Sequence, residues 1–128
     1  MIRIAMLAFL AAAGLTGSAT AATKPPEAGM ETYFANTLEI GVPAAMWSTS
    51  RYFERDHTYR DVGDGGEARG RWSIEDGKLC VVPERPLKPE WNRFCNLPLD
   101  RKPGNAWLTT DPYTENTVML KLAPGRRP

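Results

Sequence analysis

The stretch from Gly70 to Val82, which reads GRWSIEDGKLCVV, decides the fold class. Its centre, Asp76-Gly77, is the strongest short-range hairpin signal, because such a turn needs residues that tolerate a positive φ. On each side of this turn, apolar residues recur at every second position, as expected of strands with one buried face: Trp72 and Ile74 before it, Leu79 and Val81 after it. The stretch therefore predicts an antiparallel β-hairpin.

Similar runs of aromatic and β-branched residues continue along the chain, separated at short intervals by Gly, Pro, Asp and Asn. The predicted strands cover residues 36–40, 47–54, 58–62, 67–74, 78–82, 92–99, 106–110 and 117–122. A sheet of short strands has two edges to protect, and closure into a small barrel is the usual solution. We expect an all-β domain over residues 36–128, an antiparallel meander of about eight strands closing into a barrel. A two-sheet sandwich is the alternative.

The same alternation selects the residues expected in the core: Phe53, Tyr59, Trp72, Ile74, Leu79, Val81, Phe94, Ala106, Trp107, Leu108, Val118, Leu120 and Leu122. Only residues 27–35 have a pattern that allows a helical turn or two, and Gly29 weakens it. Because residues 23–29 pair two prolines with small and polar residues, we expect residues 23–35 to form a flexible leader.

The first 22 residues have the composition of a secretory signal peptide. Arg3 and the free amine precede an apolar run that ends in small residues, which predicts cleavage near Ala21 or Ala22. The apolar run is short for a bilayer span, which needs roughly 20 apolar residues, so we expect no stable membrane insertion after processing. The sequence thus predicts a periplasmic or secreted protein.

The chain has two cysteines, Cys80 and Cys95, and no C-x-x-C motif. In an oxidising compartment this count indicates one disulfide, which would close a loop of about 15 residues and contribute roughly 3 kcal/mol. A catalytic thiolate is the alternative, but it requires a nearby base, and His57 is the only histidine. We therefore expect both sulfurs to be structural.

Charge excludes some partners. Without Arg3 the predicted mature chain has 15 Lys and Arg residues against 15 Asp and Glu residues, so it lacks the basic excess of a nucleic-acid-binding protein. Arginines on or beside the predicted strands are interleaved with carboxylates, which indicates cross-strand charge pairs on a solvated face: Arg51, Arg55, Arg60, Arg69, Arg71 and Arg93 with Glu54, Asp56, Asp61 and Glu67. The sequence contains no motif for a cofactor or a metal, and a metal site at His57 would lack a second histidine.

Two residues are candidates for a binding site. His57, next to Asp56, has the chemistry of a general base or a ligand contact, although histidine is also enriched at turn positions with positive φ. Trp91 lies in the proline-rich segment KPEWNRF, outside the regular strand pattern, where an exposed indole would mark a contact surface for a small ligand or an envelope protein.

Short motifs spread over most of the predicted mature chain also resemble a loosely defined group of small exported bacterial proteins. The matching residues are Asn36-Thr37, Asp56 with Thr58-Tyr59, Gly70 with Trp72, Asp76-Gly77 with Leu79-Cys80, Cys95, and Gly104 with Trp107. The chain departs from the group's pattern at His57, Pro103 and Asn105. The resemblance implies no particular activity or cofactor. The group is distantly similar to lipocalin-like barrels, which is an analogy of fold and not of function.

From these features we expect a non-catalytic, exported binding module that takes a small apolar ligand or a protein partner. A structural or stress-related envelope protein without a specific ligand ranks second. An enzyme ranks third, because it would need His57 or a carboxylate pair inside a pocket.

Overall fold

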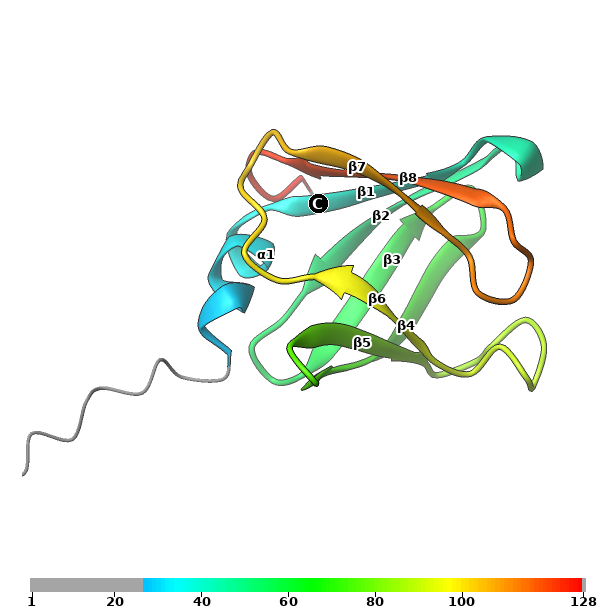
Figure 1. Ribbon diagram of the computed structural model, residues 1–128, viewed down its shortest axis with the longest axis horizontal. Helices are drawn as coiled ribbons and strands as arrows, with labels where there is room; N and C mark the ends of the chain where they lie inside the picture. The colour runs from blue at the N-terminus through cyan, green and yellow to red at the C-terminus, as the bar shows by residue number, and fades with distance from the viewer. Residues whose placement is uncertain (1–26, 128) are drawn as a thin grey trace, which may run out of the picture.

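Eight antiparallel strands form a single sheet that curves into a nearly closed barrel (Figure 1). The computed structural model describes residues 27–127. The fold confirms the predicted all-β class and the predicted barrel, and it is not the alternative two-sheet sandwich. The predicted signal peptide, residues 1–22, and residues 23–26 of the predicted leader lie outside the described residues.

Two short helical segments precede the first strand, and a third lies between the first and the second strand. The elements are η1 (Ala28–Met30), α1 (Glu31–Ala35), β1 (Thr37–Val42), η2 (Pro43–Ala45), β2 (Trp47–Phe53), β3 (Thr58–Gly63), β4 (Gly66–Glu75), β5 (Lys78–Pro83), β6 (Phe94–Pro98), β7 (Ala106–Thr110) and β8 (Thr117–Ala123). Each predicted strand is present within two residues of its predicted ends. The central hairpin turns at Asp76 and Gly77, whose φ values of 51° and 74° show why this dipeptide is needed there.

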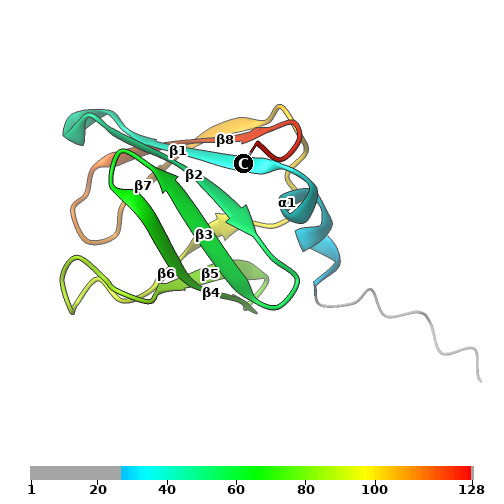
Figure 2. The same ribbon diagram turned by 180° about the vertical axis from the view of Figure 1, so that it is seen from behind.

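The strand order is β6-β5-β4-β3-β2-β1-β8-β7, so neighbours in sequence are neighbours in the sheet from β1 to β6. The chain returns to β1 through the pairing of β8 with β1, so that the barrel stays open between β6 and β7, which are the two edges of the sheet. Figures 1 and 2 show these edges on the same side of the barrel. We call the interval between them the β6–β7 seam.

Residues 28–35 belong to the folded domain and not to a flexible leader, which corrects the predicted boundary at residue 35. The helical segment lies at one end of the barrel, beside β1 and the end of β6 (Figures 1 and 2). Met30 and Tyr33 are completely buried, and the Tyr33 hydroxyl donates a hydrogen bond to the Pro98 carbonyl at 2.5 Å. The predicted leader was drawn too long because it was based on the prolines after the predicted cleavage site, whereas Met30 and Tyr33 cover the end of the core.

The barrel core consists of the protein's own apolar side chains. Fourteen buried residues form one cluster: Met30, Tyr33, Phe34, Leu38, Ile40, Phe53, Tyr59, Trp72, Leu79, Val81, Leu97, Val118, Leu120 and Leu122. Ile74, Phe94 and Trp107 pack against this cluster and are partly buried. Ala106 and Leu108, in contrast, are exposed, so the predicted buried face of β7 is wrong. Trp107, between them, faces the core instead.

Candidate functional site

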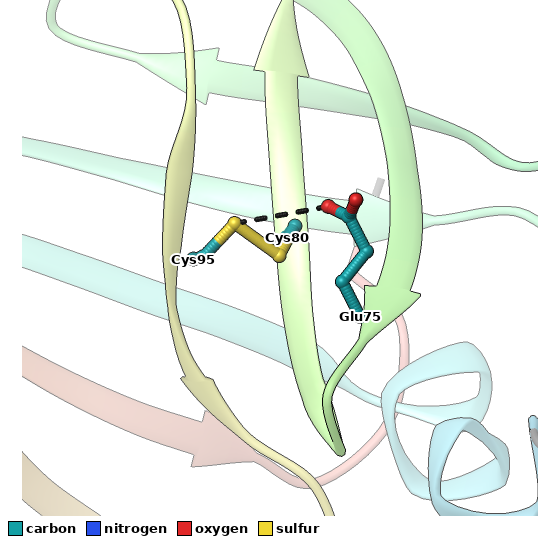
Figure 3. A group of neighbouring side chains, drawn as sticks. All are labelled: Glu75, Cys80 and Cys95. Atoms are coloured by element: carbon teal, nitrogen blue, oxygen red, sulfur yellow. Dashed lines mark hydrogen bonds between the residues drawn. A yellow bond between two sulfur atoms is a disulfide. The ribbon is translucent and has the colours of Figure 1, made fainter.

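The two cysteines are joined to each other, as predicted. The Cys80–Cys95 disulfide links β5 to β6 across a sequence separation of 15 residues (Figure 3). Glu75 Oε2 lies 3.9 Å from Cys95 Sγ, so these three residues come as close together as metal ligands do. Because both sulfurs are consumed by the disulfide, the cluster has no thiolate to offer a metal or a substrate.

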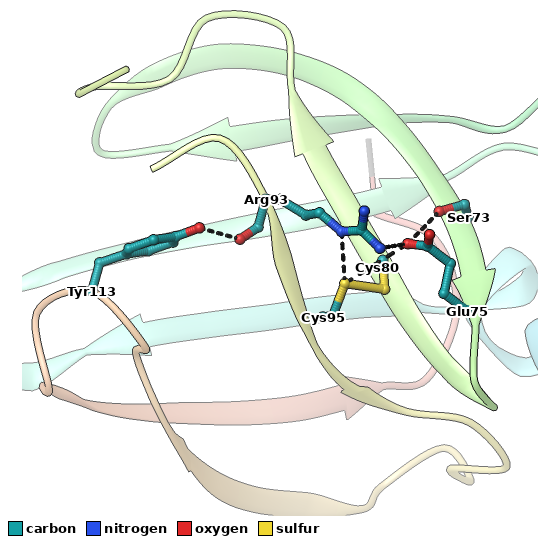
Figure 4. Close-up of a disulfide and its surroundings, with 6 residues drawn as sticks. All are labelled: Ser73, Glu75, Cys80, Arg93, Cys95 and Tyr113. Atoms are coloured by element: carbon teal, nitrogen blue, oxygen red, sulfur yellow. Dashed lines mark hydrogen bonds and ion pairs between the residues drawn. A yellow bond between two sulfur atoms is a disulfide. The ribbon is translucent and has the colours of Figure 1, made fainter. Parts of the chain in front are cut away.

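Arg93 completes the surroundings of the disulfide (Figure 4). Its Nε donates to Cys95 Sγ at 3.1 Å, and its guanidinium forms an ion pair with Glu75. The Tyr113 hydroxyl donates to the Arg93 carbonyl at 2.6 Å, which ties the loop after β7 to the start of β6. This arrangement is structural, because it holds the edge strand β6 in place at the seam.

His57 occupies a turn position with a φ of 69°. Its ring stacks on Trp72 with the centroids 4.1 Å apart, and its Nε2 lies 2.6 Å from Glu27 Oε1. Nearby, Arg55 forms two hydrogen bonds with the Glu31 carboxylate, which hold the pKa of Glu31 below its usual value. These contacts join the helical segment to the turn between β2 and β3, beside a hollow of about 350 Å³.

Trp91 is partly buried at the seam. Its ring stacks on Tyr113 at a centroid distance of 6.3 Å, and the Lys88 ammonium lies 4.8 Å from its centre. Tyr113 also meets Phe94 edge to face. The contacts of Trp91 and those of His57 involve separate sets of residues, so the structure does not bring the two predicted site residues together.

The barrel interior contains an ion pair whose two charges predicted a position on the solvated face. Arg51 and Asp61 lie on paired strands, and their side chains are only 14% and 12% exposed, with Arg51 Nε 2.6 Å from Asp61 Oδ1. Burial by itself would lower the pKa of Arg51, but the hydrogen bond and the charge of Asp61 raise it. The guanidinium also lies 4.5 Å from the Tyr59 ring centre. A charged pair in this position makes the interior poorly suited to a purely apolar ligand.

A larger hollow, of about 690 Å³, lies on the outer face of the sheet and was not predicted. Its floor is a row of paired residues whose backbone faces outward: Trp107, Leu120, Ile40 and Thr49, whose side chains point into the barrel, and Gly63. The two flanking rows point outward and form its walls, about 7 Å apart along the strands. We call this hollow the outer groove.

The walls of the outer groove combine small residues with exposed apolar ones. One wall runs from Leu108 through Met119 and Gly41 to Ser48, and the other contains Ala106, Lys121, Glu39, Ser50 and Val62. Leu108, Met119 and Val62 are 66%, 52% and 42% exposed. A Cβ atom added at Gly41 would meet only the Met119 carbonyl oxygen, at 4.0 Å, so this glycine keeps one wall open.

Part of this surface was visible in the sequence. The alternation that buries Val118 and Leu120 leaves Met119 facing outward, and an exposed apolar side chain of this size is one indication of an interaction surface. The groove itself was not visible, because it needs residues from five strands that only the sheet order brings side by side.

No protein-family model, curated protein or solved structure matches this chain. The resemblance to small exported proteins therefore stays an expectation. Among residues 27–127, no helix has the length and apolar character required to cross a bilayer.

Proposed function

We propose that the chain is an exported, non-catalytic binding module that docks a protein partner on the outer groove. The observation that carries this proposal is the exposure of Leu108, Met119 and Val62 on the walls of one continuous hollow. Exposed apolar side chains that share a recess are typical of interaction surfaces, whereas scattered ones need no explanation.

The choice of a protein over a small apolar ligand rests on the core. The buried cluster and the interior Arg51–Asp61 pair occupy the place where a lipocalin-type ligand would lie. The outer groove is open along the sheet and has one acidic and one basic side chain, Glu39 and Lys121, on directly paired positions. It therefore suits a neutral partner that inserts apolar side chains between two walls.

The chemistry of the lining supports binding rather than catalysis. The residues that line the outer groove include no histidine or cysteine, and Glu39 has Lys121 rather than a second carboxylate as its nearest neighbour across the ladder. General acid–base catalysis needs a positioned proton donor and acceptor with matched pKa values. His57, the remaining candidate base, lies outside this groove.

The test is photo-crosslinking in the native envelope, with a benzophenone amino acid in place of Met119. The same amino acid at Val82, which is 44% exposed on β5, is the matched control. We expect one discrete adduct from position 119 and none from position 82. Adducts of equal yield from both positions, or none from either, would count against a docking site on this face.

A groove-filling variant then tests the site with the identified partner. Because a Cβ atom at Gly41 would meet only the Met119 carbonyl oxygen, at 4.0 Å, we expect Gly41→Val to fold normally, to fill part of the outer groove and to weaken partner binding about tenfold or more. Unchanged affinity would remove the groove from the proposal. N-terminal sequencing of the exported protein tests the export step separately, with a mature start at residue 22 or 23 as the expected result.

A further inference from the structure

The two edges of the sheet are protected very differently. β6 ends in Pro98, which has no N–H to donate, and its pairing with β5 contains a register shift. Tyrosine hydroxyls from outside the strand bind the carbonyls of Pro98 and Arg93. Proline, an irregular ladder and occupied backbone groups are the devices by which natural proteins prevent edge strands from pairing with other chains.

β7 has none of these devices. Its sequence, Ala-Trp-Leu-Thr-Thr, contains no charged residue and no proline, and its pairing with β8 is regular from end to end. Among the described residues, no strand pairs with its other side. β7 is therefore a regular, uncharged and β-prone edge, which is the feature that strand addition requires.

The ladder shows which backbone groups face this free edge. The Leu122 N–H donates to the Asn105 carbonyl at 2.9 Å, and hydrogen-bonded positions alternate along an antiparallel pair. Trp107 and Thr109 therefore bond to β8. The N–H and C=O groups of Ala106, Leu108 and Thr110 point away from β8, toward the free edge.

We propose that a second copy of this chain adds to β7, antiparallel to it, and forms a symmetric dimer with the twofold axis at Leu108. In this register Leu108 faces Leu108 of the second copy, and Ala106 faces Thr110 in both directions. All three outward-pointing N–H groups and all three C=O groups of each copy then find partners. A register centred on Trp107 would leave Thr110 opposite a residue beyond the end of the strand.

Charge selects a second copy over an arbitrary extended peptide. Arg101 and Lys102 precede β7, and Asp111 and Glu115 follow it. Antiparallel pairing sets the basic start of one strand beside the acidic end of the other, and it does so twice.

Side chains on the outer face favour the same arrangement. Leu108 is 66% exposed and is paired with Met119, which is 52% exposed. Joining two β7 edges brings the two Leu108 side chains together across the axis, at the β7 end of the outer groove, while Met119, one strand farther from the axis, stays available to the proposed partner. Closed twofold assemblies use one patch twice in this way, which avoids open-ended aggregation along the edge.

Sedimentation equilibrium of the full mature chain, from micromolar to millimolar concentration, tests the dimer. We expect a monomer–dimer equilibrium that Leu108→Lys weakens about tenfold or more, because it places two like charges opposite each other at the axis. Val82→Lys, on the outer face of β5, should leave it unchanged. Because the Leu108 side chain is exposed in the single copy, Leu108→Lys should not alter the unfolding midpoint at a concentration low enough for both proteins to be monomeric.

Two further variants test the register. Leu108→Cys should form a covalent dimer with a short bifunctional thiol reagent, and Met119→Cys, one strand farther from the axis, should form much less. A strictly monomeric protein, association that survives Leu108→Lys, or stronger crosslinking at position 119 than at 108 would overturn the proposal.

Discussion

Removal of the disulfide should destabilise the domain by an amount that follows from its position. The cross-link closes a loop of 15 residues, and the chain-entropy relation gives about 3 kcal/mol for such a loop at 25 °C. Domains of roughly this size lose about 4–8 °C in Tm per kcal/mol, so the expected decrease is roughly 12–24 °C. Alanine is the appropriate replacement at both positions, because a serine hydroxyl at the fully buried Cys80 would lack solvent.

The assay is urea and thermal unfolding of the Cys80→Ala, Cys95→Ala double variant beside the parent protein, each with and without reductant. Reductant should bring the parent close to the double variant and leave the double variant unchanged. Glu75→Gln is the matched control, since it breaks the exposed ion pair with Arg93 and keeps the disulfide. We expect it to cost less than about 1 kcal/mol. A loss below about 1 kcal/mol in the double variant, or an equal loss in the control, would refute the loop-closure reasoning.

Three further predictions concern packing and ionisation. Met30→Ala should lower the free energy of unfolding in urea by about 2–5 kcal/mol, because Met30 is completely buried. An unchanged free energy would show that the helical segment does not contribute to the core. Gly70→Ala should cost about 1–3 kcal/mol, because its Cβ would lie 2.4 Å from the Val82 carbonyl oxygen, whereas Gly41→Ala should be nearly neutral in the same assay. Burial raises the pKa of Tyr59 to about 12 from 10.0, so stability should be complete below pH 10 and fall as the pH rises toward 12. Denaturation at several alkaline pH values should show a shallower fall in Tyr59→Phe, and identical pH profiles would contradict this assignment.

Local features of the chain account for the parts of the fold that were predicted correctly. The Asp76-Gly77 turn, the alternation on either side of it and the spacing of the other turn residues gave all eight strands within two residues. The cysteine pair was predictable because only two cysteines are present. Each of these signals depends on neighbouring residues or on composition, and none requires knowledge of which strands lie side by side.

The errors occurred where local signals were ambiguous. In β7 three consecutive residues are apolar, Ala106, Trp107 and Leu108, so the alternation does not show which of them face the core. In the structure the large Trp107 indole packs against the core, and Ala106 and Leu108 face outward. Arg51 and Asp61 were assigned to solvent by their charge, but a mutual ion pair allows both to face the interior. The helical segment was placed in a leader because of the prolines before it, although Met30 and Tyr33 were needed to cover the end of the core.

The sequence by itself determined the strands, the turns and the disulfide, since these follow from the conformational preferences of adjacent residues and from the number of cysteines. The tertiary structure alone decided that β8 pairs with β1, that β7 is left as an unprotected edge, and that five strands form the outer groove. The physical reason is that strand pairing and side-chain packing depend on contacts between residues far apart in the chain, where many arrangements share the same local pattern and only the packed core selects one.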